Sequence, residues 1–116
     1  MPDMSRMDGI VTLSERKAAE ATRRQRAVGE LRLALDAYGR AHGGRFLLFG
    51  SAARGDMRYD SDVDILLDFP PDRLSSAWRF AERACRDRRL EPDIMPFEWC
   101  KDDFLAHARP DFVVLG

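Results

Sequence analysis

Two short groups of residues, separated by ten residues, carry side chains suited to phosphate and metal chemistry. Gly50 and Ser51 follow the apolar run 45–49, and Asp62 and Asp64 open a second apolar run. Side chains alternate along a strand, so Asp62 and Asp64 are expected on one face, about 6–7 Å apart. Two such carboxylates repel each other unless a cation lies between them. Mg²⁺ is the natural candidate, because proteins often hold it by one or two carboxylates together with substrate phosphates.

Gly50 and Ser51 suit the phosphate side of such a site. Glycine allows close backbone approach, and serine supplies a hydroxyl and an N–H where a helix is expected to begin. Either half of the pattern alone is more often structural, because Gly-Ser is a common turn and aspartate is common at strand starts. The joint pattern of four fixed positions arises by chance in on the order of one such sequence per thousand, so it favours a functional site.

The elements that must position these residues follow from caps, breakers and periodicity. Thr12 with Glu15 fits a capping box and Gly43-Gly44 fits a helix stop, which predicts one long helix over residues 13–42. Further elements are predicted as strands at 45–49, 62–69, 91–96 and 112–115, and as helices at 73–89 and near 98–108. Residues 1–11 are expected to be a loose end. The resulting fold class is α/β (α+β).

The first half of the long helix is rich in positive charge. Its basic residues are Arg16, Lys17, Arg23, Arg24 and Arg26. We expect them to form mostly a solvated face. The alternative is a docking surface for a partner, because a helix of this length overhangs a small core.

Composition narrows the class of protein. The 116 residues include 19 Lys+Arg and 20 Asp+Glu, a net charge of −1 that argues against non-specific nucleic-acid binding. The 45% hydrophobic and 34% charged residues are typical of a single globular domain. The charge is distributed in blocks: 46–72 and 93–116 are acidic, whereas 1–45 and 73–92 are basic and fall on the predicted long helices.

Nothing in the sequence predicts a membrane or secreted location. No apolar run approaches the ~20 residues of a membrane span, and the first residues have no signal-peptide pattern. Cys85 and Cys100 lack the spacing of a redox or zinc pair and are interpreted as buried thiols in a reducing compartment. The predicted location is the cytoplasm.

The residues around the two groups resemble a known signature. Phe-Gly-Ser-Ala-Ala-Arg-Gly-Asp at 49–56 and Tyr-Asp-Ser-Asp-Val-Asp-Ile-Leu at 59–66 are similar to the Gly-Ser, ten residues, Asp-x-Asp pattern of the DNA polymerase beta-like nucleotidyltransferase superfamily. These two segments look like those of the minimal nucleotidyltransferases of this superfamily, which include the antitoxins paired with HEPN toxins. The resemblance implies a small mixed sheet of about four strands flanked by helices. Within one domain, we expect residues 1–44 to form a tail and long helix packed on a minimal core at 45–116.

The resemblance also implies a nucleoside triphosphate, two Mg²⁺ ions and transfer of a nucleotidyl group to an acceptor hydroxyl. Gly50 and Ser51 would hold the triphosphate, and Asp62 and Asp64 would bind the metals. Asp93 matches by position a third carboxylate of the family, as a metal ligand that could accept the proton of the acceptor hydroxyl.

Arg54 has two interpretations of equal weight. Its guanidinium could contact a phosphate of the bound nucleotide, or it could pair with Asp56 or Asp60.

Only 23 residues follow Asp93, so the acceptor-binding domain of larger relatives is not expected and the acceptor is predicted to be a protein. In the toxin–antitoxin relatives it is a tyrosine of the HEPN toxin, which is silenced by AMP from ATP. We therefore predict Mg²⁺-dependent transfer of AMP from ATP to a small helical HEPN-like toxin, in a hetero-oligomer with that toxin. Two alternatives stay open: a binding-only antitoxin that occludes its partner, and a transferase acting on a small hydroxylated molecule.

Overall fold

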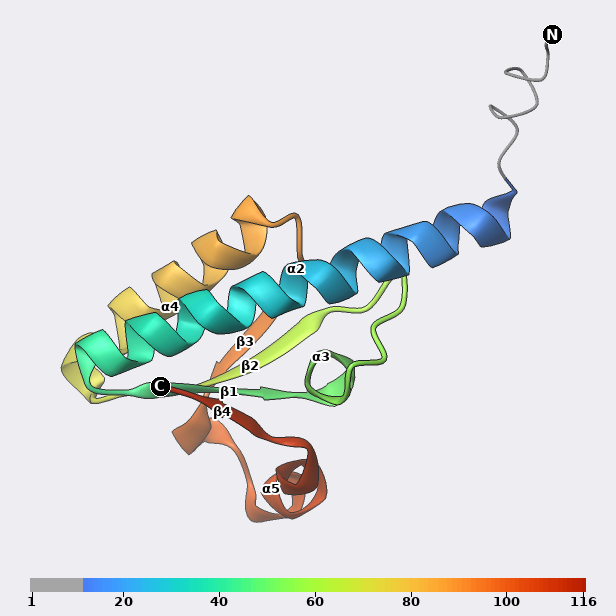
Figure 1. Ribbon diagram of the computed structural model, residues 1–116. Helices are drawn as coiled ribbons and strands as arrows, with labels where there is room; N and C mark the ends of the chain where they lie inside the picture. The colour runs from blue at the N-terminus through green and yellow to red at the C-terminus, as the bar shows by residue number, and fades with distance from the viewer. Residues whose placement is uncertain (1–11) are drawn as a thin grey trace, which may run out of the picture.

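The long first helix, α2 (Leu13–His42), begins and ends where its capping residues predict. A computed structural model describes residues 12–116 (Figure 1). The Thr12 side chain accepts a hydrogen bond from the Glu15 backbone and the Glu15 carboxylate accepts one from Thr12, which completes the capping box. Gly43 ends the helix in the left-handed conformation, with φ of 70°.

Four strands form one mixed sheet in the order β3-β2-β1-β4. β1 (Arg45–Phe49) lies antiparallel to both β2 (Val63–Asp68) and β4 (Val113–Leu115), whereas β3 (Pro92–Pro96) lies parallel to β2. The parallel pairing needs a crossover, and α4 (Pro71–Asp87) provides it. This confirms the predicted mixed sheet of four strands flanked by helices.

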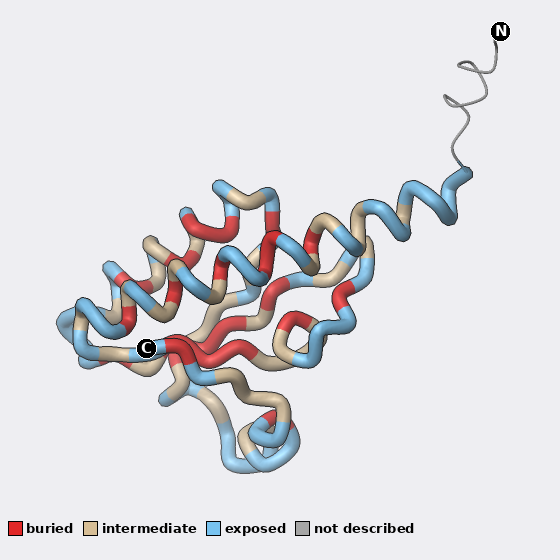
Figure 2. Tube along the Cα trace, viewed as in Figure 1, coloured by how far each residue is buried: buried red, intermediate tan, exposed pale blue. Residues whose placement is uncertain are grey.

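The two long helices cover one face of the sheet (Figure 1). Val28, Leu31 and Leu35 of α2 pack in the same core cluster as alternate residues of β1 and β2, and the alanines at 77, 81 and 84 bring α4 onto that core. Figure 2 shows this buried band running along the middle of α2 and the sheet. By strand alternation, Asp64 and Asp93 lie on the opposite face of the sheet.

Short helices complete the chain. α3 (Gly50–Arg54) joins β1 to the loop before β2, and α5 (Asp102–Ala108) lies between two 3₁₀ turns, η1 (Phe97–Trp99) and η2 (Arg109–Asp111). The helix predicted near 98–108 is thus a turn and a shorter helix. The strand predicted at 62–69 begins one residue later, at Val63, so Asp62 lies in the preceding loop.

Several smaller expectations can be compared with the structure. The predicted loose end at 1–11 lies outside the described residues. Cys85 and Cys100 are free thiols, but only Cys85 is fully buried, and burial raises its pKa to about 12. Among residues 12–116, no helix combines the length and apolar character needed to cross a membrane.

Candidate functional site

The site is built at the end of β1, where the chain turns sharply from strand into α3. Gly50 makes the turn with φ of 69°, a conformation that favours glycine. A methyl group at Gly50 would lie 2.5 Å from Oδ2 of Asp64, so glycine also leaves room for that carboxylate. Ser51 follows in the first turn of α3, half-buried, and its hydroxyl lies 3.5 Å from the Met57 sulfur.

The sheet brings two of the three predicted carboxylates side by side. Asp64 of β2 is the register partner of Phe49 on one side and of Asp93 on the other. Neighbouring strands are about 4.8 Å apart, and register partners project to the same face, so Asp64 and Asp93 are close neighbours. Asp62 lies in the loop two residues before Asp64. Asp62 and Asp93 are exposed, whereas Asp64 is half-buried.

Electrostatics confirm that these carboxylates influence one another. Burial, together with the negative charges of Asp93 and Asp62, raises the pKa of Asp64 from 3.8 to about 6, and Arg54 acts in the opposite direction. Partial burial and two neighbouring carboxylates make the ionised form of Asp64 less favourable than it is in water. A bound cation would remove that cost.

The donor set suits Mg²⁺ in kind, because Asp62, Asp64 and Asp93 offer the hard oxygen ligands that this ion prefers. Because Gly50 has no Cβ, the Asp64 carboxylate has room beside the turn. Within residues 12–116, no group of three or more His, Cys, Asp or Glu side chains is arranged so that it could hold a metal ion. An ion bound by these carboxylates would need further oxygens, from the substrate or water, to complete its coordination.

Arg54 stands at the end of α3 and is held by two carboxylates. Its Nε donates to Asp56 at 3.2 Å, and its Nη1 donates to Asp111 of η2 at 3.0 Å. The pairing with Asp56 is one of the two interpretations of this residue, and Asp111 was not foreseen. Both pairs are exposed to solvent, so Arg54 can exchange either partner for a phosphate at little cost.

Side chains of α2 hold the segments that carry the site, a role that sequence reasoning missed. Arg32 donates to the carbonyls of Ala52 and Ala53 in α3, and Gln25 accepts a hydrogen bond from the Met57 backbone. Arg24 donates to the carbonyl of Ser61. These contacts join residues more than nineteen positions apart, so no local pattern shows them.

The expectation of a mostly solvated basic face is therefore wrong for part of α2. Arg24 is only 8% exposed, and Arg23 is half-buried because it donates to the carbonyls of Arg88 and Arg89. Arg16 and Arg26 are exposed, as expected. A usable signal was present: Arg24 is four residues before Val28 and seven before Leu31, which places it on the buried stripe of the helix.

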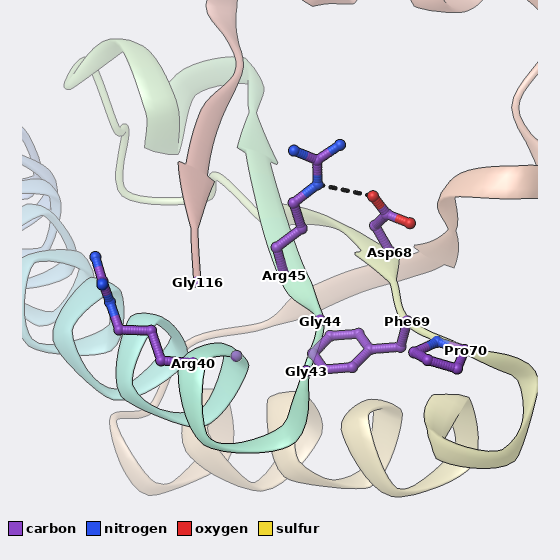
Figure 3. A pocket seen from close by; sticks show the side chains of 9 residues that line it. Arg40, Gly43, Gly44, Arg45, Asp68, Phe69, Pro70 and Gly116 are labelled. Atoms are coloured by element: carbon purple, nitrogen blue, oxygen red, sulfur yellow. Dashed lines mark hydrogen bonds and ion pairs between the residues drawn. The ribbon is translucent and has the colours of Figure 1, made fainter.

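An open hollow of about 650 Å³ lies at the other end of the sheet (Figure 3). It is lined by the C-terminal turn of α2, the start of β1 and the end of β2, and its Arg45 donates to Asp68 at 2.7 Å. β1 begins beside this hollow, and Gly50 follows the other end of that strand. The hollow is therefore separate from Asp62, Asp64 and Asp93.

The fold and the site define a class: a small mixed-sheet domain that presents carboxylates beside a Gly-Ser turn. Residues 28–111 match the family described as "Nucleotidyltransferase domain". That match spans well over half of the sequence, and the chain belongs to this nucleotidyltransferase family. Searches of curated proteins and of solved structures gave no significant match. The resemblance seen in the sequence is thus confirmed at the level of the nucleotidyltransferase superfamily, whose general chemistry uses a nucleoside triphosphate and a divalent metal.

Proposed function

We propose that this protein transfers AMP from ATP to a hydroxyl group on a small helical partner of the HEPN toxin type, and acts as that toxin's antitoxin in the cytoplasm. The observation that carries the proposal is the register of Asp64 with Asp93 beside the Gly50 turn. Family membership supports nucleotidyl transfer, and the local resemblance to antitoxins supports the partner.

In this proposal each site residue has one role in the displacement of pyrophosphate from the α-phosphorus. Gly50 and Ser51 hold the triphosphate, and Asp62, Asp64 and Asp93 would hold two Mg²⁺ ions. The acceptor hydroxyl oxygen forms a bond to the α-phosphorus, the bond from that phosphorus to the bridging oxygen breaks, and pyrophosphate leaves. Asp93 accepts the hydroxyl proton. When bound, Mg²⁺ supplies positive charge that stabilises the attacking and leaving oxygens.

A protein acceptor fits the exposure of the site. Asp62 and Asp93 are exposed, and no second domain lies over them within residues 12–116. In this proposal the acceptor hydroxyl lies on the partner protein, whose surface would exclude water from the carboxylates during transfer.

The test is transfer of label from α-labelled ATP to the product of a neighbouring gene in the presence of Mg²⁺. Asp64→Asn should abolish transfer while the protein stays folded. Asp68→Asn is a matched control, because Asp68 projects from the same face of β2 but pairs with Arg45 at the far end. Undiminished transfer by Asp64→Asn would overturn the mechanism.

A binding-only antitoxin is the second candidate, and the first turns of α2 favour it. Figure 1 shows this end of the helix extending away from the sheet, and Leu13 is 67% exposed. Such an apolar side chain on a projecting helix could anchor a partner without chemistry. Toxin neutralisation that persists in the Asp62→Asn/Asp64→Asn double variant would favour this candidate. Loss of neutralisation with binding intact would eliminate it.

A further inference from the structure

Arg24 is the one charged side chain that is buried within residues 12–116. Its guanidinium contacts three groups: Nε donates to Glu20 at 2.8 Å, and Nη1 donates to the Ser61 carbonyl at 2.7 Å and to Glu91 at 3.0 Å. Burying a cation costs free energy unless it is paired and hydrogen-bonded, and these contacts meet that requirement.

The groups that Arg24 joins lie next to the site carboxylates. Ser61 immediately precedes Asp62, and Glu91 is two residues before Asp93. The Glu91 carbonyl also accepts a hydrogen bond from the Val63 backbone at 2.8 Å, which ties the start of β2 to the residue before β3. Arg24 thus bridges the two segments from which Asp62, Asp64 and Asp93 project.

We propose that Arg24 is a positioning residue that fixes the Asp62 loop against the start of β3, so that the three carboxylates can bind a divalent cation together. This inference rests on the proposed function for the identity of the cation, but the contacts of Arg24 stand without it. Arginine suits the task because its planar fork makes several directed hydrogen bonds, which a lysine ammonium on a flexible stem does not reproduce.

Arg23 provides a matched control on the same helix. It also binds Glu20, and it also donates to two backbone carbonyls, but these belong to Arg88 and Arg89 in the turn after α4. Arg23→Gln therefore removes a comparable set of contacts without touching the Asp62 loop.

The test compares Mn²⁺ binding, followed by electron paramagnetic resonance, in the full chain and in the variants Arg24→Gln and Arg23→Gln. Loss of a residue that orients metal ligands typically weakens metal affinity by about 10-fold to 100-fold, and we expect about tenfold for Arg24→Gln. Arg23→Gln should stay within about twofold of the wild type. If Arg24→Gln does not fold, Arg24→Lys keeps the charge and should still weaken binding several-fold. Unchanged binding in the folded Arg24 variant, or equal weakening in Arg23→Gln, would overturn the proposal.

Hydrogen exchange separates this inference from the proposed function. The backbone amides of Arg58, Ser61 and Val63 are hydrogen-bonded in and beside the Asp62 loop. Their exchange should accelerate in Arg24→Gln and not in Arg23→Gln. If the wild type binds no Mn²⁺, the proposed function fails while the exchange rates still decide whether Arg24 fixes the loop. Equal exchange in both variants would overturn the role of Arg24.

Discussion

Asp64 and Asp93 are register partners on two neighbouring parallel strands, and both project from the face of the sheet opposite the long helices. A sheet position of this kind normally holds apolar or oppositely charged neighbours, because like charges on adjacent strands destabilise the sheet. Here the pair stands beside a third carboxylate, Asp62, and a glycine turn. The arrangement costs stability, as expected of the cation site that we propose here.

We expect Asp64→Asn to stabilise the protein in Mg²⁺-free buffer at neutral pH. The folded-state pKa of Asp64, about 6, lies above its ordinary value of 3.8, so folding disfavours the ionised form. That penalty is fully present above pH 6 and disappears as pH falls through 6 towards 3.8. After discounting for solvent screening, the gain is on the order of 1 kcal/mol, or about 4 °C in melting temperature.

Thermal unfolding at neutral pH and near pH 4 measures this effect. The advantage of Asp64→Asn over the wild type should be present at neutral pH and mostly lost near pH 4, because the pKa of Asp64 is about 6 in the folded state and 3.8 ordinarily. A variant that is less stable than the wild type at neutral pH would show that Asp64 forms a stabilising contact instead.

We expect Mg²⁺ to stabilise the wild type, and the effect to weaken below pH 6. Metal bound only to the folded state at a concentration one hundredfold above its dissociation constant adds about 2.7 kcal/mol to the free energy of unfolding. Protonation of Asp64, whose pKa is about 6, removes one ligand charge as pH falls. Melting curves with Mg²⁺ and with a chelator, recorded on both sides of pH 6, give the comparison. An identical Mg²⁺ effect at all these values would contradict a role for Asp64 in binding.

The sequence predicted the limits of helices and strands correctly where neighbouring residues determine them. The capping box at Thr12 and the left-handed stop at Gly43 set the limits of α2 correctly. The strand beginning at Arg45 was also predicted at its observed limits. Boundaries shifted where tertiary contacts decide them, as for β2, which begins at Val63 because pairing with β3 begins there.

The geometry of the site was only partly predictable. Spacing in the sequence identified Gly50, Ser51, Asp62 and Asp64. Strand order and register place Asp93 beside Asp64, and no local sequence pattern predicts either of them. The role of Arg24 depends on a carbonyl 37 positions away and a carboxylate 67 positions away. Such partners become visible only in the folded chain.

Gly50→Ala should impair both folding and Mg²⁺ binding, whereas Gly43→Ala should impair folding alone. Both glycines have positive φ, 69° and 70°, so alanine introduces a strain of about 1–2 kcal/mol at either position. The new methyl group meets Asp64 at 2.5 Å in the first case and no atom within 4 Å in the second. Chemical denaturation with and without Mg²⁺ tests the pair. A full Mg²⁺ response in Gly50→Ala would show that the Asp64 carboxylate has room to move.

Arg54→Gln should weaken nucleotide binding without a comparable loss of stability. The ion pairs of Arg54 with Asp56 and Asp111 are exposed and contribute little to folding. Loss of a charged hydrogen bond to phosphate would weaken affinity for a fluorescent ATP analogue by about tenfold. The pKa of Asp64 should also rise further, because Arg54 lowers it in the wild type.

The control for Arg54→Gln is Arg45→Gln, which removes a similarly exposed ion pair, with Asp68, at the opposite end of β1. Its nucleotide affinity should match the wild type, because Arg45 lies away from Gly50 and the carboxylates. If Arg54→Gln binds the analogue as tightly as Arg45→Gln, then Arg54 serves only to connect α3 with η2 through Asp111. Reduced affinity in Arg54→Gln alone, with unchanged melting temperatures in both variants, would place its guanidinium at the phosphates.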